Sequence, residues 1–203
     1  MGGVFDPPHR GHLALASAAL DALPISEVRF VISARPPHKE GAVASSPEHR
    51  RAMVEIATGH DRRLVVDDRE LRREGPSYTV TTLEELRAEQ PDRTLFFLVG
   101  GDNIRTIGRW FRAERIFALC RVIAMPRPGE PQTWTGEDVP FLEASELARL
   151  NADVLDAPEI CASSTEIRAA VCAGDWDRVR EETGPELAKA IQDLGIYRTN
   201  GRA

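Results

Sequence analysis

The residues best suited to chemistry are concentrated at the start of the sequence. Residues 2–12 combine two glycines, an Asp-Pro-Pro turn and a His-x-Gly-His unit. Glycine lets a backbone approach a phosphate closely, and the start of a helix offers free N–H groups and a partial positive charge. His9 and His12 are three residues apart, so both rings lie on one face of the first helical turn. This pattern predicts a phosphate site, whereas a capped helix with two incidental histidines leaves the glycines and the Asp-Pro-Pro turn unexplained.

Two later segments carry groups that could hold other anions. Residues 35–39 place His38 and Lys39 after a Pro-Pro pair, beyond a predicted strand, where ligands of α/β sheets bind. The residues alone fit a solvated basic loop equally well. Residues 163–168 (Ser-Ser-Thr-Glu-Ile-Arg) open a late helix, where hydroxyls, N–H groups and Arg168 suit an anion. A capping box with one of the two serines as the cap is the alternative there.

The segment 75–79, Gly-Pro-Ser-Tyr-Thr, precedes another predicted helix. Its plain interpretation is a helix start capped by Ser77 or Thr79. Its functional interpretation is that the first N–H groups of that helix receive a carboxylate. The residues by themselves do not decide between the two.

Residues 100–103, Gly-Gly-Asp-Asn, directly follow the strongest predicted strand. A carboxylate at this position, Asp102, suits the hydroxyls of a ribose, although a structural turn between strand and helix is the alternative. Trp110 and Phe111 follow shortly after. Aromatic side chains are more often core than ligand-binding, but an electron-poor ring would stack well on an indole face.

Taken together, these segments resemble the nicotinate-nucleotide adenylyltransferase family, part of the wider HxGH nucleotidylyltransferases. Residues 2–12 look like its GGxFDPxHxGH signature. Segments similar to its PPHK/R, SYT, GxD, Trp-aromatic and SSTxIR motifs follow in order, so the resemblance extends to about residue 197. Ala162 is a minor departure, since the family often has a β-branched residue there. The resemblance implies transfer of an adenylyl group from ATP to nicotinate mononucleotide, giving nicotinate adenine dinucleotide and pyrophosphate in NAD biosynthesis.

The resemblance also implies roles for individual residues. The expected catalytic residues are His9, His12, Lys39 and Arg168. The expected ATP-binding residues are Gly2, Gly3, Val4, Phe5, His12, Gly100, Asp102, Ser164, Thr165 and Arg168. The mononucleotide would contact His38, Lys39, Tyr78, Thr79, Asp102, Trp110 and Phe111. In this scheme the amides at Tyr78 and Thr79 hold the nicotinate carboxylate and Trp110 stacks on the pyridine ring. No carboxylate cage for a metal is visible, so Mg²⁺ is expected to arrive with ATP.

Several rival functions remain open from the sequence. The acceptor could be nicotinamide mononucleotide, or phosphopantetheine, although the family acting on the latter has Thr in place of the first histidine. A catalytically impaired nucleotide-binding protein is another candidate, because only Met1 precedes the Gly2-Gly3 turn that should follow a strand. The first strand is therefore either very short, or the sequence starts downstream of the natural start. An RNA-binding relative is disfavoured because no basic stripe is present.

The elements that must position these residues alternate along the chain. Strands are expected at 28–32, 64–66, 94–99 and 121–125, and helices at 9–23, 47–58, 79–89 and 113–119. This alternation predicts an α/β fold, a doubly wound, mostly parallel, Rossmann-like sheet. A polar, mobile loop is expected at 126–140. Helices at 164–173, 176–182 and 185–194 would form a C-terminal helical cap (163–197) within a single domain of residues 1–203.

Composition sets further limits. The 203 residues carry a formal net charge of −6, which argues against a nucleic-acid polymer as partner. The three cysteines, Cys120, Cys161 and Cys172, form no CxxC pair, so we expect buried, reduced thiols. No apolar run reaches the roughly 20 residues that span a bilayer, and no export signal is visible. The sequence predicts a cytoplasmic protein with no membrane partner, and it leaves a homo-oligomer possible.

Overall fold

The computed structural model describes residues 1–35, 44–126, 129–155 and 162–198. The strands are β1 (Gly2–Gly3), β2 (Val28–Ile32), β3 (Leu64–Asp67), β4 (Phe96–Gly100) and β5 (Arg121–Met125). The first helices are α1 (Arg10–Ala22), α2 (Pro47–Thr58), α3 (Arg69–Arg72), α4 (Thr79–Glu89) and α5 (Ala113–Leu119). They are followed by α6 (Ala144–Ala152), α7 (Ser164–Ala173), α8 (Trp176–Thr183) and α9 (Pro185–Leu194). Two short 3₁₀ helices, η1 (Gly101–Asn103) and η2 (Ile107–Arg109), follow β4.

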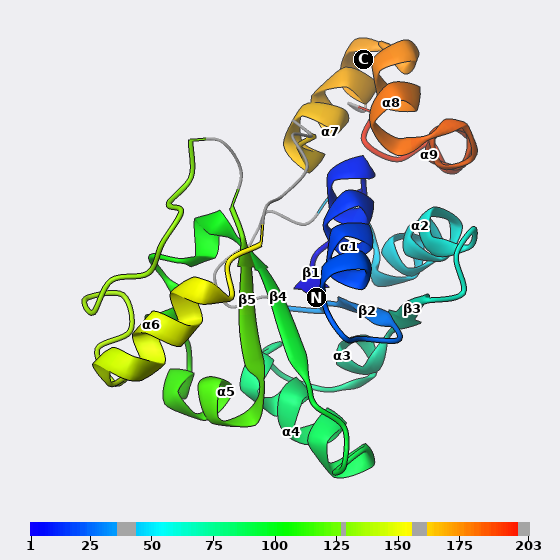
Figure 1. Cartoon of the computed structure of the whole chain (residues 1–203). Helices are drawn as coiled ribbons and strands as arrows, with labels where there is room; N and C mark the ends of the chain where they lie inside the picture. The colour runs from blue at the N-terminus through cyan, green and yellow to red at the C-terminus, as the bar shows by residue number, and fades with distance from the viewer. Residues whose placement is uncertain (36–43, 127–128, 156–161, 199–203) are drawn as a thin grey trace.

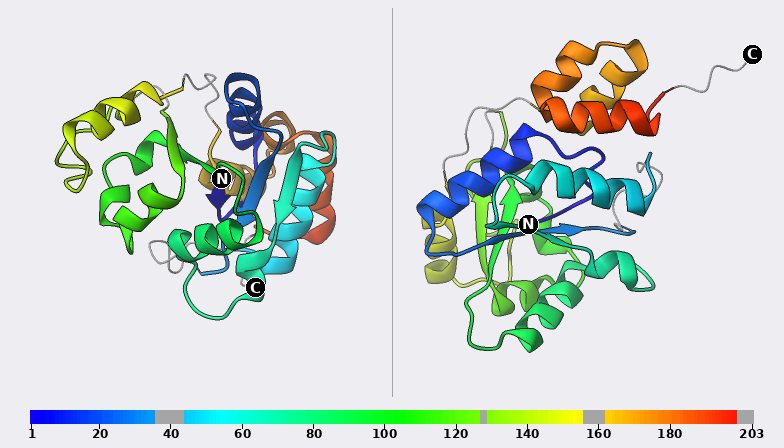
Figure 2. Two further views of the ribbon diagram at one scale, coloured as in Figure 1. Left: turned by 60° about the horizontal axis from the view of Figure 1, so that its bottom comes forward. Right: turned by 90° about the vertical axis from the view of Figure 1, so that its right-hand side faces the viewer.

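The strands pair in parallel, as predicted, but in two sheets. One sheet has the order β1-β2-β3 and the other consists of β4 and β5. β1 is only two residues long, and Gly2 and Gly3 pair with Val31 and Ile32 of β2. The figures show β1 between β2 and β4, so its end lies near the middle of the whole strand array (Figures 1 and 2). The Gly2-Gly3 turn is therefore central to the fold.

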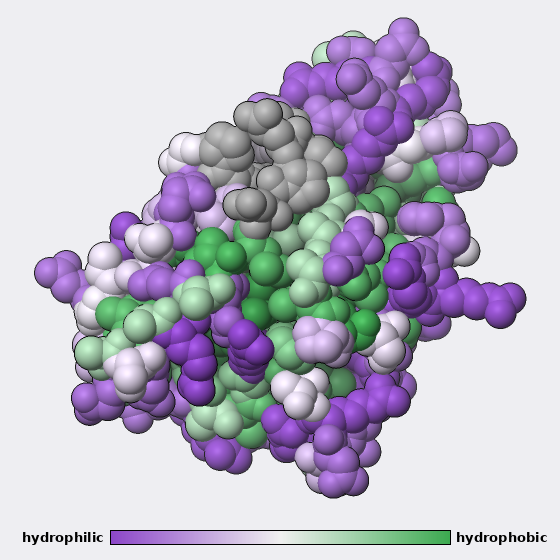
Figure 3. All heavy atoms as spheres, in the orientation of Figure 1, coloured by the Kyte–Doolittle hydropathy of each residue, from purple (hydrophilic) through white to green (hydrophobic). Residues whose placement is uncertain are grey.

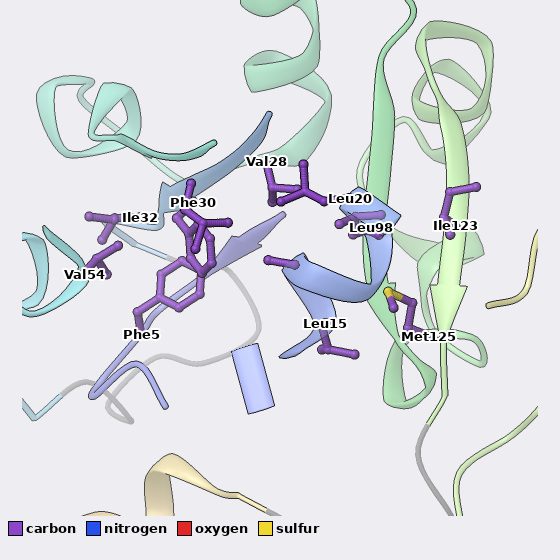
Figure 4. Packing of buried hydrophobic residues seen from close by; sticks show 13 residues of the cluster. Phe5, Leu15, Leu20, Val28, Phe30, Ile32, Val54, Leu98, Ile123 and Met125 are labelled. Atoms are coloured by element: carbon purple, nitrogen blue, oxygen red, sulfur yellow. The ribbon is translucent and has the colours of Figure 1, made fainter. Parts of the chain in front are cut away.

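Alternating side chains give the strands two covered faces. Leu98 and Ile123 pack with α1 residues such as Leu15 and Leu20, in the cluster that Figure 4 shows. Their sequence neighbours Phe97, Val99, Val122 and Ala124 pack on the other side with buried residues of α4, α5 and α6. Successive residues of a strand point to opposite faces. This arrangement confirms the predicted doubly wound α/β class.

The C-terminal helices have a core of their own that is completed by α2. Met53 and Ala57 of α2 pack against Ile167, Leu187 and Ile191, and all five side chains are buried. The three helices lie close to their predicted bounds, and glycines Gly174 and Gly195 end α7 and α9 in the left-handed region. The start of α7 is thus attached to the body of the molecule through packing on α2.

Some elements differ from the sequence-based expectation. The short helices α3 and α6 were not predicted. The segment 129–140 lacks helix and strand as expected, and Trp134 and Val139 within it are buried in the core. The mobility expected of this loop stays a prediction. The expected burial of the thiols was wrong for two of them: Cys120 is half-buried and Cys172 is exposed. Cys161 lies outside the described residues.

Candidate active site

A cavity of about 1380 Å³ opens at the carboxyl ends of β1 and β4 and continues down between the two sheets. Ligands of open α/β sheets bind at this edge. Every predicted site residue that the structure describes lines this cavity: Gly2, Gly3, Val4, Phe5, His9, His12, Tyr78, Thr79, Gly100, Asp102, Trp110, Phe111, Ser164, Thr165 and Arg168. Figure 3, in the orientation of Figure 1, shows apolar residues in the middle of the molecule with hydrophilic residues around them. The cavity brings together segments far apart in the chain.

The amino-terminal turn is folded tightly around Gly3. Phe5 adopts a left-handed backbone (φ 53°), and its buried ring lies under the turn, where a Cβ on Gly3 would be only 3.0 Å from it. A larger residue at position 3 would therefore have to displace that ring. With glycine at position 3, the Phe5 ring can pack against one side of the backbone while the other side of the backbone lines the cavity.

The two histidines form a stacked pair at the start of α1. His9 is the N-cap residue, and its ring lies 3.8 Å from that of His12, centroid to centroid. The His9 backbone N–H donates to Nδ1 of His12 over 3.2 Å. A ring nitrogen that accepts a hydrogen bond carries no proton, so neutral His12 carries its proton on Nε2. His12 is therefore oriented as a hydrogen-bond donor through Nε2.

The start of α7 meets this turn directly. The Ser164 hydroxyl donates to the Pro7 carbonyl over 2.8 Å, and the Arg168 guanidinium donates to the Asp6 carbonyl over 2.8 Å. The convergence of the two distant segments, which the sequence-based interpretation requires, is thus present. The proposed capping box was wrong: Ser163 is the N-cap residue, and no side chain caps this helix. Ser164 faces Pro7 instead.

The start of α4 forms another wall of the cavity. Its N-cap residue is Tyr78, again without a side-chain cap, so the alternative interpretation of a cap by Ser77 or Thr79 does not hold. The Ser77 hydroxyl instead accepts from the N–H groups of Ala34 and Arg35, at 3.0 and 3.1 Å. Ser77 therefore fastens the start of α4 to the end of β2. Two helices thus begin on this cavity with first-turn N–H groups that no side chain caps.

Aromatic rings surround the start of α4. The ring of Phe111, which is 53% exposed, lies 4.5 Å from that of Tyr78. Trp110 is half-buried and meets Phe97 edge-on at 6.2 Å. An indole held at one edge by the core and open on the cavity is suited to stack on a flat ligand ring.

Two features fix the loop that carries these aromatic residues, and both were missed in the sequence. A Cβ on Gly108 would lie 1.9 Å from the Asp138 carbonyl oxygen, so only glycine fits there. A Cβ on Gly101 would meet the backbone of Pro126 at 2.8 Å. Both contacts join residues that are distant in sequence, and no local pattern indicates them.

A buried arginine, also missed, supports the amino-terminal turn from below. Arg50 of α2 is 1% exposed and donates to the carbonyls of Val4, at 3.0 Å, and Ser33, at 2.6 Å. Burial lowers the pKa of Arg50, but an arginine stays charged in proteins. Its positive charge therefore lies beneath the carboxyl ends of β1 and β2, where it favours an anion.

Some expectations cannot be placed. His38 and Lys39 lie outside the described residues. Within the described part of the chain, no group of three or more His, Cys, Asp or Glu side chains could hold a metal ion. In that same part, no helix is long and apolar enough to cross a membrane. Asp102 is exposed on the cavity, and its Oδ1 accepts from the Asn103 amide over 2.7 Å.

Comparison with known proteins identifies the family of this chain. The Cytidylyltransferase-like family model matches residues 1–170. A protein of Rhodopirellula baltica named "Probable nicotinate-nucleotide adenylyltransferase" is 35% identical over 98% of this chain and 92% of its own length. One of the same name from a Synechococcus species is 38% identical over 97% of this chain and 92% of its own. The chain belongs to the nicotinate-nucleotide adenylyltransferase family.

Solved structures agree with this family at the level of the fold. The nicotinic acid mononucleotide adenylyltransferase of Plasmodium falciparum, complexed with NaAD, superposes with a TM-score of 0.73 at 20% identity. The match covers 97% of this chain and 94% of that one. The adenylyltransferase family and the Rossmann-like fold expected from the sequence are both confirmed.

Proposed function

We propose that this adenylyltransferase joins ATP to nicotinate mononucleotide, giving nicotinate adenine dinucleotide and pyrophosphate, within residues 1–203 acting as one domain. The observation that carries the proposal is the meeting of the His9–His12 turn with the uncapped start of α7 on one cavity. The family shown by the relatives supports the same reaction.

The chemistry is a direct displacement. A phosphate oxygen of the mononucleotide attacks the α-phosphorus of ATP and forms a new P–O bond. The bond from that phosphorus to the bridging oxygen breaks, and its electron pair leaves with pyrophosphate. A phosphate monoester is already a nucleophile, so catalysis consists of aligning two anions and stabilising the charge that develops.

The phosphate end of the cavity supplies the donors for this step. We assign Nε2–H of His12, with His9 beside it, to the ATP phosphates, together with the backbone of Gly2 and Gly3. Arg168 would stabilise the departing pyrophosphate. The Ser164 hydroxyl proton is directed to Pro7, so this residue would offer its backbone N–H instead. ATP would bring a divalent cation, which we propose is Mg²⁺, as part of the substrate.

The other end suits the pyridine nucleotide. The N–H groups at the start of α4 would receive the nicotinate carboxylate. Trp110 would stack on the ring, and Phe111 and Tyr78 would close its edge. Asp102 would bind ribose hydroxyls. A carboxamide carries no charge to complement the helix start, so we expect the acid to be preferred over the amide.

We place this reaction in the cytoplasm. Assembly into a homo-oligomer stays a prediction.

The test is a turnover assay with purified protein, MgATP, and nicotinate or nicotinamide mononucleotide side by side. We expect pyrophosphate release that depends on both substrates and a kcat/KM about tenfold or more higher for the acid, the scale of a helix-start interaction in a partly buried site. ATP without acceptor is the control. Release that is independent of the acceptor, or absent altogether, would contradict adenylyl transfer, and preference for the amide would contradict our assignment of α4.

A further inference from the structure

The Asp6 carboxylate is the meeting point of three distant parts of the chain. Asp6 is 2% exposed and lies in the amino-terminal turn, next to the carbonyls that bind α7. Its Oδ2 accepts from the Ala44 N–H at 2.6 Å, and its Oδ1 accepts from the Ser45 hydroxyl. The Tyr197 hydroxyl donates to the same Oδ1 over 2.5 Å. A carboxyl group is costly to bury unless it is hydrogen-bonded, and these contacts offset that cost for Asp6.

Tyr197 is held at two ends. Its carbonyl oxygen accepts from the thiol of Cys172, a residue of α7, over 2.8 Å. Its hydroxyl reaches Asp6, which is 191 positions earlier in the sequence. Its backbone is left-handed (φ 62°), a conformation that costs a non-glycine residue energy unless the surroundings impose it. Tyr197 therefore links α7 to the amino-terminal turn.

The tyrosine hydroxyl remains a hydrogen-bond donor throughout the physiological pH range. Burial, followed by the hydrogen bond to Asp6, raises the pKa of Tyr197 well above its ordinary value. The phenol thus keeps its proton and remains a donor at any physiological pH. The negative charge of Asp6 makes the bond stronger than one between neutral groups.

We propose that the Tyr197–Asp6 hydrogen bond is a positioning device, which fixes the angle of α7 so that Arg168 and the first N–H groups of that helix face the triphosphate. This inference rests on the proposed function. Ser164 and Arg168 hold the first turns of α7 at the carbonyls of Pro7 and Asp6. The contact of Cys172 with Tyr197 adds a fixed point near the other end of the helix, which restrains pivoting about its start.

The experiment compares Tyr197→Phe with Thr183→Val. Tyr197→Phe removes one hydroxyl and keeps the ring. Thr183→Val is the matched control, since it removes a buried hydroxyl from the same group of helices, where it donates only to the carbonyls of Val179 and Gly184. For each protein, KM for ATP, KM for nicotinate mononucleotide and the melting temperature are measured.

We expect Tyr197→Phe to raise KM for ATP about tenfold or more, the scale of one hydrogen bond to a charged group. KM for the mononucleotide should stay within twofold, and Thr183→Val should change neither constant even if it lowers the melting temperature as much. Unchanged kinetics in Tyr197→Phe, equal rises in both KM values, or the same rise in the control would overturn the proposal. A wild-type protein without turnover would refute the proposed function instead, so the two failures are distinguishable.

Discussion

The starts of α4 and α7 both have an extended N-cap residue, and they differ in the side chains around them. Each helix begins on the cavity with no side-chain cap, so each presents N–H groups and the positive end of its dipole. The start of α7 is next to Arg168 and the stacked His9–His12 pair. The start of α4 is next to the rings of Tyr78 and Phe111. In the proposed function both places receive an anion through the backbone, and the neighbouring side chains decide which anion each one suits.

Under the proposed function, these different surroundings would let one cavity discriminate between two anions. A triphosphate carries several charges and needs several cationic or strongly donating groups. A carboxylate on an aromatic ring carries one charge and a flat apolar surface, which rings can cover. Each end of the cavity has one of these two sets of partners.

The largest expected effect comes from breaking the phosphate end. His12→Ala removes the donor at Nε2 and the acceptor of the His9 N–H. We expect kcat to fall by on the order of 10²-fold or more, the scale for loss of one preorganised donor. Steady-state kinetics with both substrates saturating measures it. Near-normal turnover would remove the catalytic role of His12.

A smaller effect should follow from breaking the pyridine end alone. Trp110→Ala removes the ring that we assign to the pyridine, and we expect KM for nicotinate mononucleotide to rise about tenfold, as for the loss of one good stacking contact. KM for ATP should stay the same. An equal rise for both substrates would mean that Trp110 supports the cavity as a whole instead of one end of it.

The sequence predicted the features that depend on residues close together in the chain. The apolar runs at 94–99 and 121–125 predicted the covered strands, which the structure has at 96–100 and 121–125. Ser46 is the N-cap residue of α2, with Pro47 in the first turn. The order of the motifs indicated a common site, and all of those in the described part of the chain line one cavity.

What the sequence did not predict depends on contacts over long distances. Nothing near Ser77 shows that its hydroxyl is taken by Ala34 and Arg35, so a cap was the natural interpretation. Nothing near Tyr197 points to Asp6. Gly108 is required by a carbonyl 30 positions away, at Asp138. Such residues acquire their roles only after the fold has brought their partners close.

The central claim is that the amino-terminal turn and the start of α7 bind one triphosphate. Calorimetric binding of ATP and of AMP to the wild type and to Arg168→Ala tests it most directly, because AMP lacks the β- and γ-phosphates. We expect Arg168→Ala to weaken ATP binding about tenfold or more, as for one lost charged hydrogen bond, and to leave AMP binding unchanged. Equal losses for ATP and AMP, or no loss for ATP, would contradict the claim.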